Sequence, residues 1–185
     1  IHAESGDVQF TDTGLSGICI FGLSIYAAEY FARGSIGGRS YKGLSVALDC
    51  LTEWSFSEVS AYLLEMRTAY PERMAGDLLA GVLNLRVGYA LVQAAGIDPT
   101  QAAKFVAPGQ LQKLVALVKA WRFTITGTKG FQDAQITAGG VPLREVDGWT
   151  MHSRKVENLY LAGEMLNVHG DCGGYNLHFA WATGL

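Results

Sequence analysis

The chain has 185 residues, of which 49% are hydrophobic and 17% are charged, with a formal net charge of −3. This predicts a soluble globular protein that buries a sizeable core in one large or two small domains. The basic residues are scattered, so the sequence gives no basic patch of the kind that indicates nucleic-acid binding, and nucleic acid is not an expected partner.

Cysteine and hydropathy patterns argue against disulfide-rich, zinc-binding, membrane-spanning and secreted proteins. Cys19, Cys50 and Cys172 lie far apart and lack CxxC spacing, which favours neither a disulfide framework nor a zinc site. The most apolar run, residues 17–28, is shorter than the roughly 20 residues of a membrane span, and no signal peptide is visible. We expect a cytoplasmic protein without a metal site and without membrane contact.

The first part of the chain predicts strands around one helix. Residues 7–10 alternate in strand fashion, and turn residues follow. Apolar residues at helical spacing then predict a helix over residues 18–33. Residues 44–51 alternate again, which predicts a strand.

The next segment has helical periodicity. Ser55 and Glu58 have the spacing of a capping box, and Pro71 is expected to start a helix because its missing N–H costs little there. Gly96 is expected to end a helix. Further helical stretches are expected at residues 72–83, 84–96, 100–106 and 109–121. The residues expected in the core are Val59, Leu63, Met66, Leu111, Leu114 and Val118, with Trp54 and Trp121 packing at the ends of the block.

Strand patterns return after the helical block. Strands are expected at residues 122–128, 133–141, 143–147 and 158–164. The helical block is thus an insertion between β segments. The expected division is a β-domain with one helix at 1–51, a helical subdomain at 52–120, a second β part at 121–150 and a last segment at 151–185.

The stretch 162–184 combines a carboxylate, glycines and a helix start. The predicted strand ends at Glu164, and Gly173 with Gly174 precedes a helix, so backbone N–H groups are exposed beside a carboxylate. This suits a ligand with hydroxyls and an electron-rich edge. The plainer interpretation is a solvated carboxylate beside an ordinary turn. No G-x-G-x-x-G follows a strand anywhere in the chain.

Three motifs, in this order, resemble the BaiN-like flavoproteins described as NAD(FAD)-utilising dehydrogenases, relatives of aminoacetone oxidase. They are GDVQFTDTGLSG at 6–17, AQITAGGVPLREVD with TMHSRKVENLYLAGE between 134 and 164, and GDCGGYNLHFAWATG at 170–184. The resemblance implies an α+β fold: a β-rich, barrel-like domain with an inserted helical subdomain, plus the C-terminal strand-turn-helix segment of a Rossmann-type FAD domain. The family's full chain is roughly twice this length and begins with the Rossmann half and its glycine fingerprint.

The resemblance also implies a cofactor site. Gly163 lets the backbone approach FAD, Glu164 accepts hydrogen bonds from ribitol or ribose hydroxyls, and the helix start lies by the flavin ring. The helix-start residues are Gly173, Gly174, Tyr175, Asn176 and Leu177. The resemblance implies NAD(P)H as the electron donor and a small organic molecule as the substrate. The partner it implies is the N-terminal half of the family's full chain, which would complete the FAD site.

No catalytic residue follows from the resemblance. Asn167 and His169 stand where the family often has Asp, so no catalytic role is carried onto Asn167. Asn176 has an alternative role as a helix cap. Cys172 has no resolving partner, and His152, His169 and His178 lack metal-like spacing, which favours structural roles for these four.

Two functions remain open from the sequence. The first is part of an FAD-dependent oxidoreductase, inactive as this chain alone because the fingerprint is missing. The second is a stand-alone, non-catalytic binding module that retains a flavoprotein-derived fold. An upstream continuation with the glycine fingerprint favours the first, and a native reading frame of this length favours the second.

Overall fold

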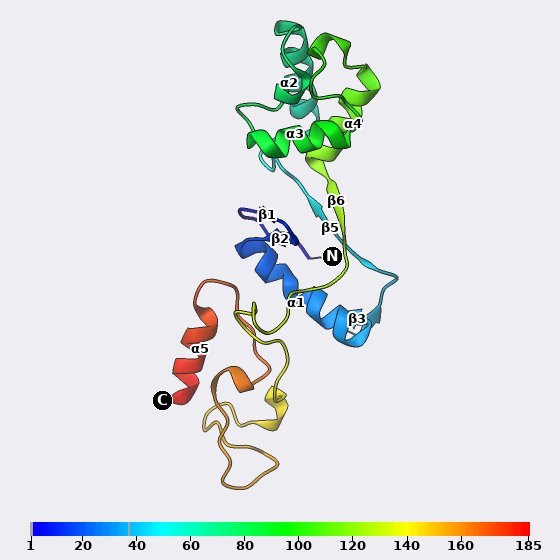
Figure 1. Ribbon diagram of the computed structural model, residues 1–185. Helices are drawn as coiled ribbons and strands as arrows, with labels where there is room; N and C mark the ends of the chain where they lie inside the picture. The colour runs from blue at the N-terminus through cyan, green and yellow to red at the C-terminus, as the bar shows by residue number, and fades with distance from the viewer. Residues whose placement is uncertain (1, 37) are drawn as a thin grey trace. The chain divides into compact units, whose positions relative to one another are not determined.

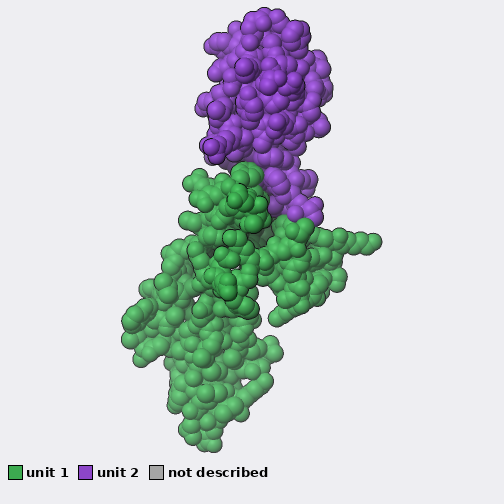
Figure 2. Space-filling model, viewed as in Figure 1, with its two compact units in different colours: residues 1–44, 125–185 green, residues 45–124 purple. Residues whose placement is uncertain are grey.

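The computed structural model describes residues 2–36 and 38–185, which contain both helices and short strands. Two compact units are present: unit 1 comprises residues 1–44 and 125–185, and unit 2 comprises residues 45–124 (Figure 2). Each unit has its own set of elements. Within the described residues, no helix is both long enough and apolar enough to cross a bilayer.

Unit 2 consists mainly of helices joined to a two-stranded sheet of β5 and β6. Helices α2 and α3 both pack against α4 (Figure 1). The elements are β5 (Leu44–Leu48), α2 (Phe56–Ala69), the 3-10 helix η1 (Ala75–Asp77), α3 (Leu85–Ala94), the 3-10 helix η2 (Ala103–Phe105), α4 (Pro108–Lys119) and β6 (Trp121–Ile125).

The core of unit 2 confirms the predicted apolar stripes. The fully buried side chains come from all three helices, because each presents one apolar face at helical spacing. They include Val59, Leu63, Leu91, Val92, Leu114 and Val118, with Leu111 buried beside them. Met66, Trp54 and Trp121 are half-buried and pack against this core. Unit 2 therefore has a hydrophobic core of its own.

The predicted start of α2 is also confirmed. The Ser55 N–H donates to Glu58 Oε2 at 2.7 Å, and the Glu58 N–H donates to Ser55 Oγ at 3.3 Å. The Glu58 carboxylate and the Ser55 hydroxyl thus accept from N–H groups that the helix itself leaves unpaired. The hydrogen bonds from Ser55 hold the pKa of the Glu58 carboxyl below its ordinary value.

Replacing Ser55 with alanine is expected to lower the free energy of unfolding by about 1 kcal/mol, since the helix loses its cap. Urea unfolding followed by circular dichroism measures the change. Ser60→Ala is the matched control, because Ser60 lies on the exposed side of the same helix. A Ser55→Ala protein as stable as the control would contradict the role of the cap.

The helices predicted from Pro71 and over residues 72–83 and 100–106 are wrong. These segments are turns with one short 3-10 helix each, η1 and η2. Their backbone groups bond to each other: the Ala75 N–H donates to Gln101 O at 2.8 Å, and the Ala103 N–H donates to Arg73 O at 2.8 Å. Pairing between the two loops replaces the local helical hydrogen bonds, and apolar periodicity alone does not reveal such pairing.

The described residues of unit 1 form two antiparallel strand pairs, two α-helices and two 3-10 helices. Strand β1 (Gln9–Thr11) pairs antiparallel with β2 (Gly14–Ser16), and β3 (Ser35–Ile36) pairs antiparallel with β4 (Arg39–Ser40). Helix α1 (Ile18–Arg33) has the predicted bounds. The other elements are η3 (Leu143–Glu145), η4 (Gly163–Met165) and α5 (Tyr175–Gly184).

Most of the segment between β6 and α5 lacks regular structure (Figure 1). The strands predicted at 133–141, 143–147 and 158–164 are wrong for the described chain, which has only single bridges such as Val141 to Leu166 there. Leu159 and Tyr160 are 39% and 64% exposed. Residues 158–164 pair only briefly and antiparallel, because the Ser153 N–H donates to Leu159 O at 2.7 Å and the Leu161 N–H donates to Met151 O at 2.9 Å. A buried strand needs longer pairing on both sides than this single bridge gives.

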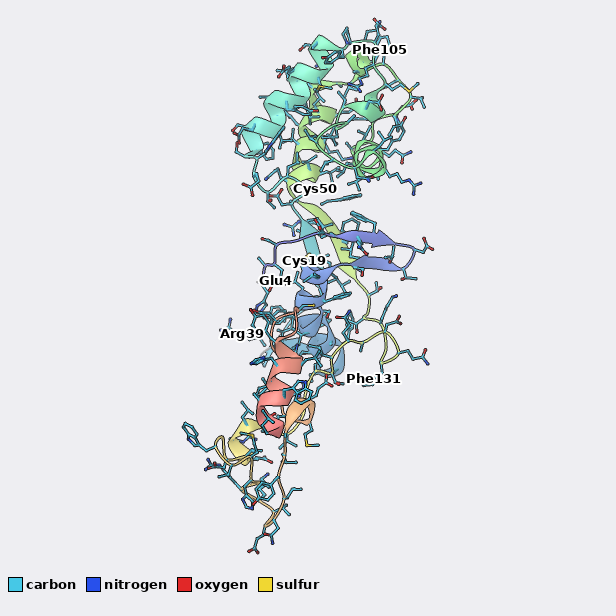
Figure 3. The ribbon with its side chains drawn as sticks, turned by 90° about the vertical axis from the view of Figure 1, so that its left-hand side faces the viewer. Glu4, Cys19, Arg39, Cys50, Phe105 and Phe131 are labelled. Atoms are coloured by element: carbon cyan, nitrogen blue, oxygen red, sulfur yellow. The ribbon has the colours of Figure 1, made fainter. Side chains whose placement is uncertain are left out.

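The predicted barrel-like closure is not seen. The described strands form three separate two-stranded sheets, and none of these closes. Large apolar side chains in unit 1 remain exposed, with Phe131 at 85% and Trp149 at 97% (Figure 3 labels Phe131). Exposed apolar side chains of this size are typical of surfaces that another segment covers. The four-segment division of the chain stays a prediction.

Candidate functional site

Gly163 fixes the turn η4 to helix α5. Its N–H donates to Thr183 Oγ1 at 2.9 Å, and that hydroxyl donates to Phe179 O at 2.8 Å. Gly163 is buried, its φ is 67°, and an added Cβ would lie 3.5 Å from Ala180 Cβ. The left-handed backbone favours glycine at this position, while the 3.5 Å distance itself is an ordinary van der Waals contact.

Glu164 follows this fixed point and lies at the surface of unit 1. Its Oε1 accepts a hydrogen bond from the Thr137 N–H at 3.1 Å, and the side chain is exposed. Within the described chain, Oε2 has no hydrogen-bond partner. The carboxylate thus keeps one oxygen available to a ligand with hydroxyl groups.

Helix α5 begins at the predicted glycine pair. Gly173 and Gly174 have φ values of 131° and 98°, and nothing lies within 4 Å of a Cβ built on either. The helix has no side-chain cap, so its first N–H groups have no partner among the described residues. Tyr175 and Leu177 are 65% and 71% exposed. The start of α5 is an open set of backbone donors.

Asn176 does not cap the helix. Its Oδ1 accepts from the Gly170 N–H at 2.8 Å, and its Nδ2 donates to Gly170 O at 3.1 Å. The Asn176 side-chain amide therefore binds both the N–H and the carbonyl group of Gly170. This pairing orders the loop that leads into the helix start, and it leaves the amide committed to the protein.

The predicted site residues fall into two groups along α5. Residues 173–177 form its start, while Gly163 contacts Ala180 and Thr183. From Tyr175 to Ala180 the helix rises about 8 Å, at 1.5 Å per residue. A ligand that reaches both groups must be extended, as a ring carrying a polyol chain is. A separate cleft of about 450 Å³ beside Trp149, Tyr160 and Thr183 contains none of the predicted site residues.

Three supporting residues were missed by the sequence interpretation. Thr137 holds Glu164 through its N–H, Gly140 packs against the backbone of residues 165–167, and the Thr183 hydroxyl accepts from the Gly163 N–H. The double glycine at 139–140 was a signal, but it was assigned to a strand. The structure describes Cys172 as a half-buried free thiol, and no cluster of metal-ligating side chains is present among the described residues.

Asp147 organises a second ordered turn of unit 1, directly after the segment 143–147 for which a strand had been expected. Its Oδ1 accepts from the Trp149 N–H at 3.0 Å and from the Thr150 N–H at 3.1 Å, and its Oδ2 accepts from Arg154 at 3.3 Å. The backbone hydrogen bonds from Trp149 and Thr150, with the Arg154 charge adding to them, hold the pKa of Asp147 below its ordinary value.

The Asp147 turn is expected to open in acid. A lowered folded-state pKa means that the stabilisation is complete above the ordinary aspartate pKa, about 3.9, and is lost as the pH falls through the lowered value. Amide exchange at Trp149 and Thr150, corrected for intrinsic rates, should show protection disappearing over this window. Asp147→Asn should remove the pH dependence. Protection unchanged from neutral to strongly acidic pH would contradict the expectation.

A family model described as "HI0933-like protein Rossmann domain" matches residues 12–185, which is most of the chain. The chain belongs to this HI0933-like family. Membership of the BaiN-like flavoproteins, predicted from the three motifs, is confirmed by this match and by a related reductase.

Two relatives of this HI0933-like chain are more than 30% identical to it. The 3-dehydro-bile acid delta(4,6)-reductase of Clostridium scindens is 35% identical over 181 residues, covering 98% of this chain and 42% of that protein. The ribosomal RNA dihydrouridine synthase of Escherichia coli is 32% identical over 188 residues, covering 99% of this chain and 43% of that protein.

A third relative is the ribosomal RNA dihydrouridine synthase of Haemophilus influenzae. It is 28% identical over 186 residues, covering 92% of this chain and 45% of that protein. The HI0933-like chain therefore spans less than half the length of each of these curated relatives.

Proposed function

We propose that this chain is the later part of an FAD-dependent reductase, whose earlier part supplies the Rossmann glycine fingerprint. The observation that carries the proposal is the arrangement along α5. The helix begins at a bare glycine pair with open N–H groups, and Glu164 is presented on a turn fixed to the same helix through Gly163 and Thr183.

The donor set at these positions fits a flavin. Glu164 Oε2 would accept a hydroxyl of the ribitol or ribose chain, while the N–H groups of Tyr175, Asn176 and Leu177 would face the ring edge that becomes negatively charged. The positive end of the helix dipole favours that charge. FAD supplies the hydride chemistry when bound. The residues of this chain bind it, orient it and stabilise its charge.

The reaction class comes from the relatives' names. Both describe adding hydrogen to a carbon–carbon double bond, one in a 3-dehydro-bile acid and one in a uridine of ribosomal RNA. In both compounds the double bond is conjugated with a carbonyl group. We propose the same class here: NAD(P)H provides a hydride, which reaches one carbon of the double bond, and a proton from solvent reaches the other. NAD(P)⁺ and the saturated carbonyl compound are the products.

A small cytoplasmic carbonyl compound is the proposed substrate. The formal net charge of −3 and the absence of a basic cluster in the sequence favour a small molecule over RNA. The RNA named for two of the relatives is the competing substrate. The proposed partner is the missing N-terminal half, which would also pair with the exposed strand segments and complete the predicted β domain.

The full-length protein, reduced by NADH or NADPH without oxygen, tests the reaction class. An unsaturated ketone is then added, and in a parallel sample a uridine-containing oligonucleotide. We expect the ketone to restore the flavin absorption and to be recovered as the saturated product. Reoxidation by the oligonucleotide alone would favour the RNA substrate. Reoxidation by oxygen alone would contradict the reductase.

A non-catalytic binding module is the second candidate. It is favoured by the exposed apolar side chains of α5, with Leu177 at 71% and Trp181 at 73%, which a partner chain would cover. The two candidate functions predict different flavin contents. A module would neither carry flavin nor consume NAD(P)H when joined to its upstream residues.

A further inference from the structure

The loop from Thr137 to Val141 is fastened to the segment that carries Glu164. The Val141 N–H donates to Met165 O at 2.8 Å, and the Asn167 N–H donates to Val141 O at 2.9 Å. The Thr137 N–H donates to Glu164 Oε1 at 3.1 Å. The two segments thus form one parallel pair with a side-chain contact at its edge.

Gly140 is the point of closest approach in this pair. Its φ is 128°, and a Cβ built on it would lie 2.6 Å from Met165 O, 2.9 Å from Leu166 C and 3.0 Å from Asn167 N. These are backbone atoms, which cannot rotate away as a side chain can. Gly139 next to it has a similar φ of 102° but nothing within 4 Å of its Cβ. Only Gly140 is therefore required for the contact itself.

The contact matters for Glu164. An exposed glutamate side chain has three rotatable bonds and loses considerable rotamer entropy when a ligand fixes it. The Thr137 N–H holds one carboxylate oxygen, and the carboxylate plane with it, before any ligand arrives. Because the loop position depends on Gly140, the orientation of the carboxylate depends on Gly140 as well.

We propose that Thr137 and Gly140 are positioning residues for the cofactor, acting through Glu164. Gly140 seats the loop against residues 165–167, and the Thr137 N–H then fixes Glu164 Oε1 so that Oε2 faces the hydroxyls of the ligand. This inference rests on the proposed function, since it assigns residues to the same FAD site. It extends that site to a loop more than 20 residues earlier in the chain.

A double-mutant cycle in the full-length protein tests the proposal. Apo-protein is titrated with FAD, and the quenching of flavin fluorescence gives the dissociation constant for wild type, Gly140→Ala, Glu164→Ala and the double variant. Gly140→Ala should weaken binding about tenfold or more, from the lost charged hydrogen bond. In the Glu164→Ala background, the same change should weaken binding less than about threefold, because the carboxylate it positions is gone.

Gly139→Ala is the matched control, since it adds a methyl group at a similar φ without the backbone contact, and it should cost less than about threefold in affinity. Thr137→Pro removes the N–H donor directly, and it should reproduce the loss of affinity seen with Gly140→Ala even if the Gly140→Ala protein folds poorly. Circular dichroism checks the fold of each protein.

The possible outcomes distinguish a failure of the positioning roles from a failure of the proposed function. Equal losses from Gly140→Ala in both backgrounds, or equal affinities of the Gly139 and Gly140 variants, would overturn the positioning roles and leave the proposed function standing. A wild-type protein that binds no FAD would overturn the proposed function, and the positioning roles with it.

Discussion

Replacing Leu63 with alanine is expected to lower the free energy of unfolding of unit 2 by about 3 kcal/mol, within the usual range of roughly 2 to 5. Leu63 is fully buried in α2, among side chains from α3 and α4. Removing three carbon atoms leaves a cavity that rigid helices on three sides fill poorly. Trp54 packs against the same core and reports on it through its fluorescence.

Leu64→Ala is the matched control for this experiment. The two residues are neighbours in α2 and lose the same atoms, but Leu64 is 53% exposed and its loss leaves no cavity. We expect a change within about 0.5 kcal/mol for Leu64→Ala. Similar urea midpoints for the two variants would contradict the assignment of Leu63 to the core.

Replacing Asn176 with alanine in the full-length protein is expected to weaken FAD binding about ten- to thirtyfold. The side chain makes two hydrogen bonds to Gly170, each worth about 1 kcal/mol, and together they hold the loop before α5. Without them the loop must be ordered when the flavin binds, so about 2 kcal/mol is subtracted from the binding free energy. Titration of apo-protein with FAD measures the loss.

Asn167→Ala is the control for this second experiment. Asn167 lies in the same loop, it is exposed, and its side chain makes no hydrogen bond within the described chain. Its replacement should change the affinity less than about threefold. If both variants bind FAD as tightly as wild type, Asn176 does not organise the site.

The helices of unit 2 could be predicted because they bury an apolar face within this chain. The bounds of α1, the capping box at Ser55 and the core positions of α2 and α4 all follow from periodicity and local chemistry. The turns after Pro71 could not be predicted, because their hydrogen bonds are made to residues about 30 positions later. Local patterns carry no information about such a distant partner.

The predictions of strands at 133–141, 143–147 and 158–164 were wrong for a different physical reason. Residues 158–164 have the composition of a buried strand, yet a strand is stabilised by neighbours that pair with it. Tyr160 makes a single bridge to His152 and is otherwise exposed. Among the described residues, this segment has only this short pairing and not a sheet.

The candidate site was predicted in part. Gly173, Gly174 and Tyr175 do form the start of a helix, and Glu164 does lie on a turn just after Gly163. Their roles toward a cofactor remain predictions. The contacts that hold Glu164 and Asn176, to Thr137 and Gly170, join residues whose proximity depends on the folded loops.

Flavin content of the full-length protein tests the central claim most directly. The protein is purified from its own organism, and its intact mass and visible absorption spectrum are recorded before and after adding FAD. We expect a chain about twice this length that carries one flavin, with the Rossmann fingerprint in its upstream half. A full-length chain that stays colourless even after FAD is added would contradict it.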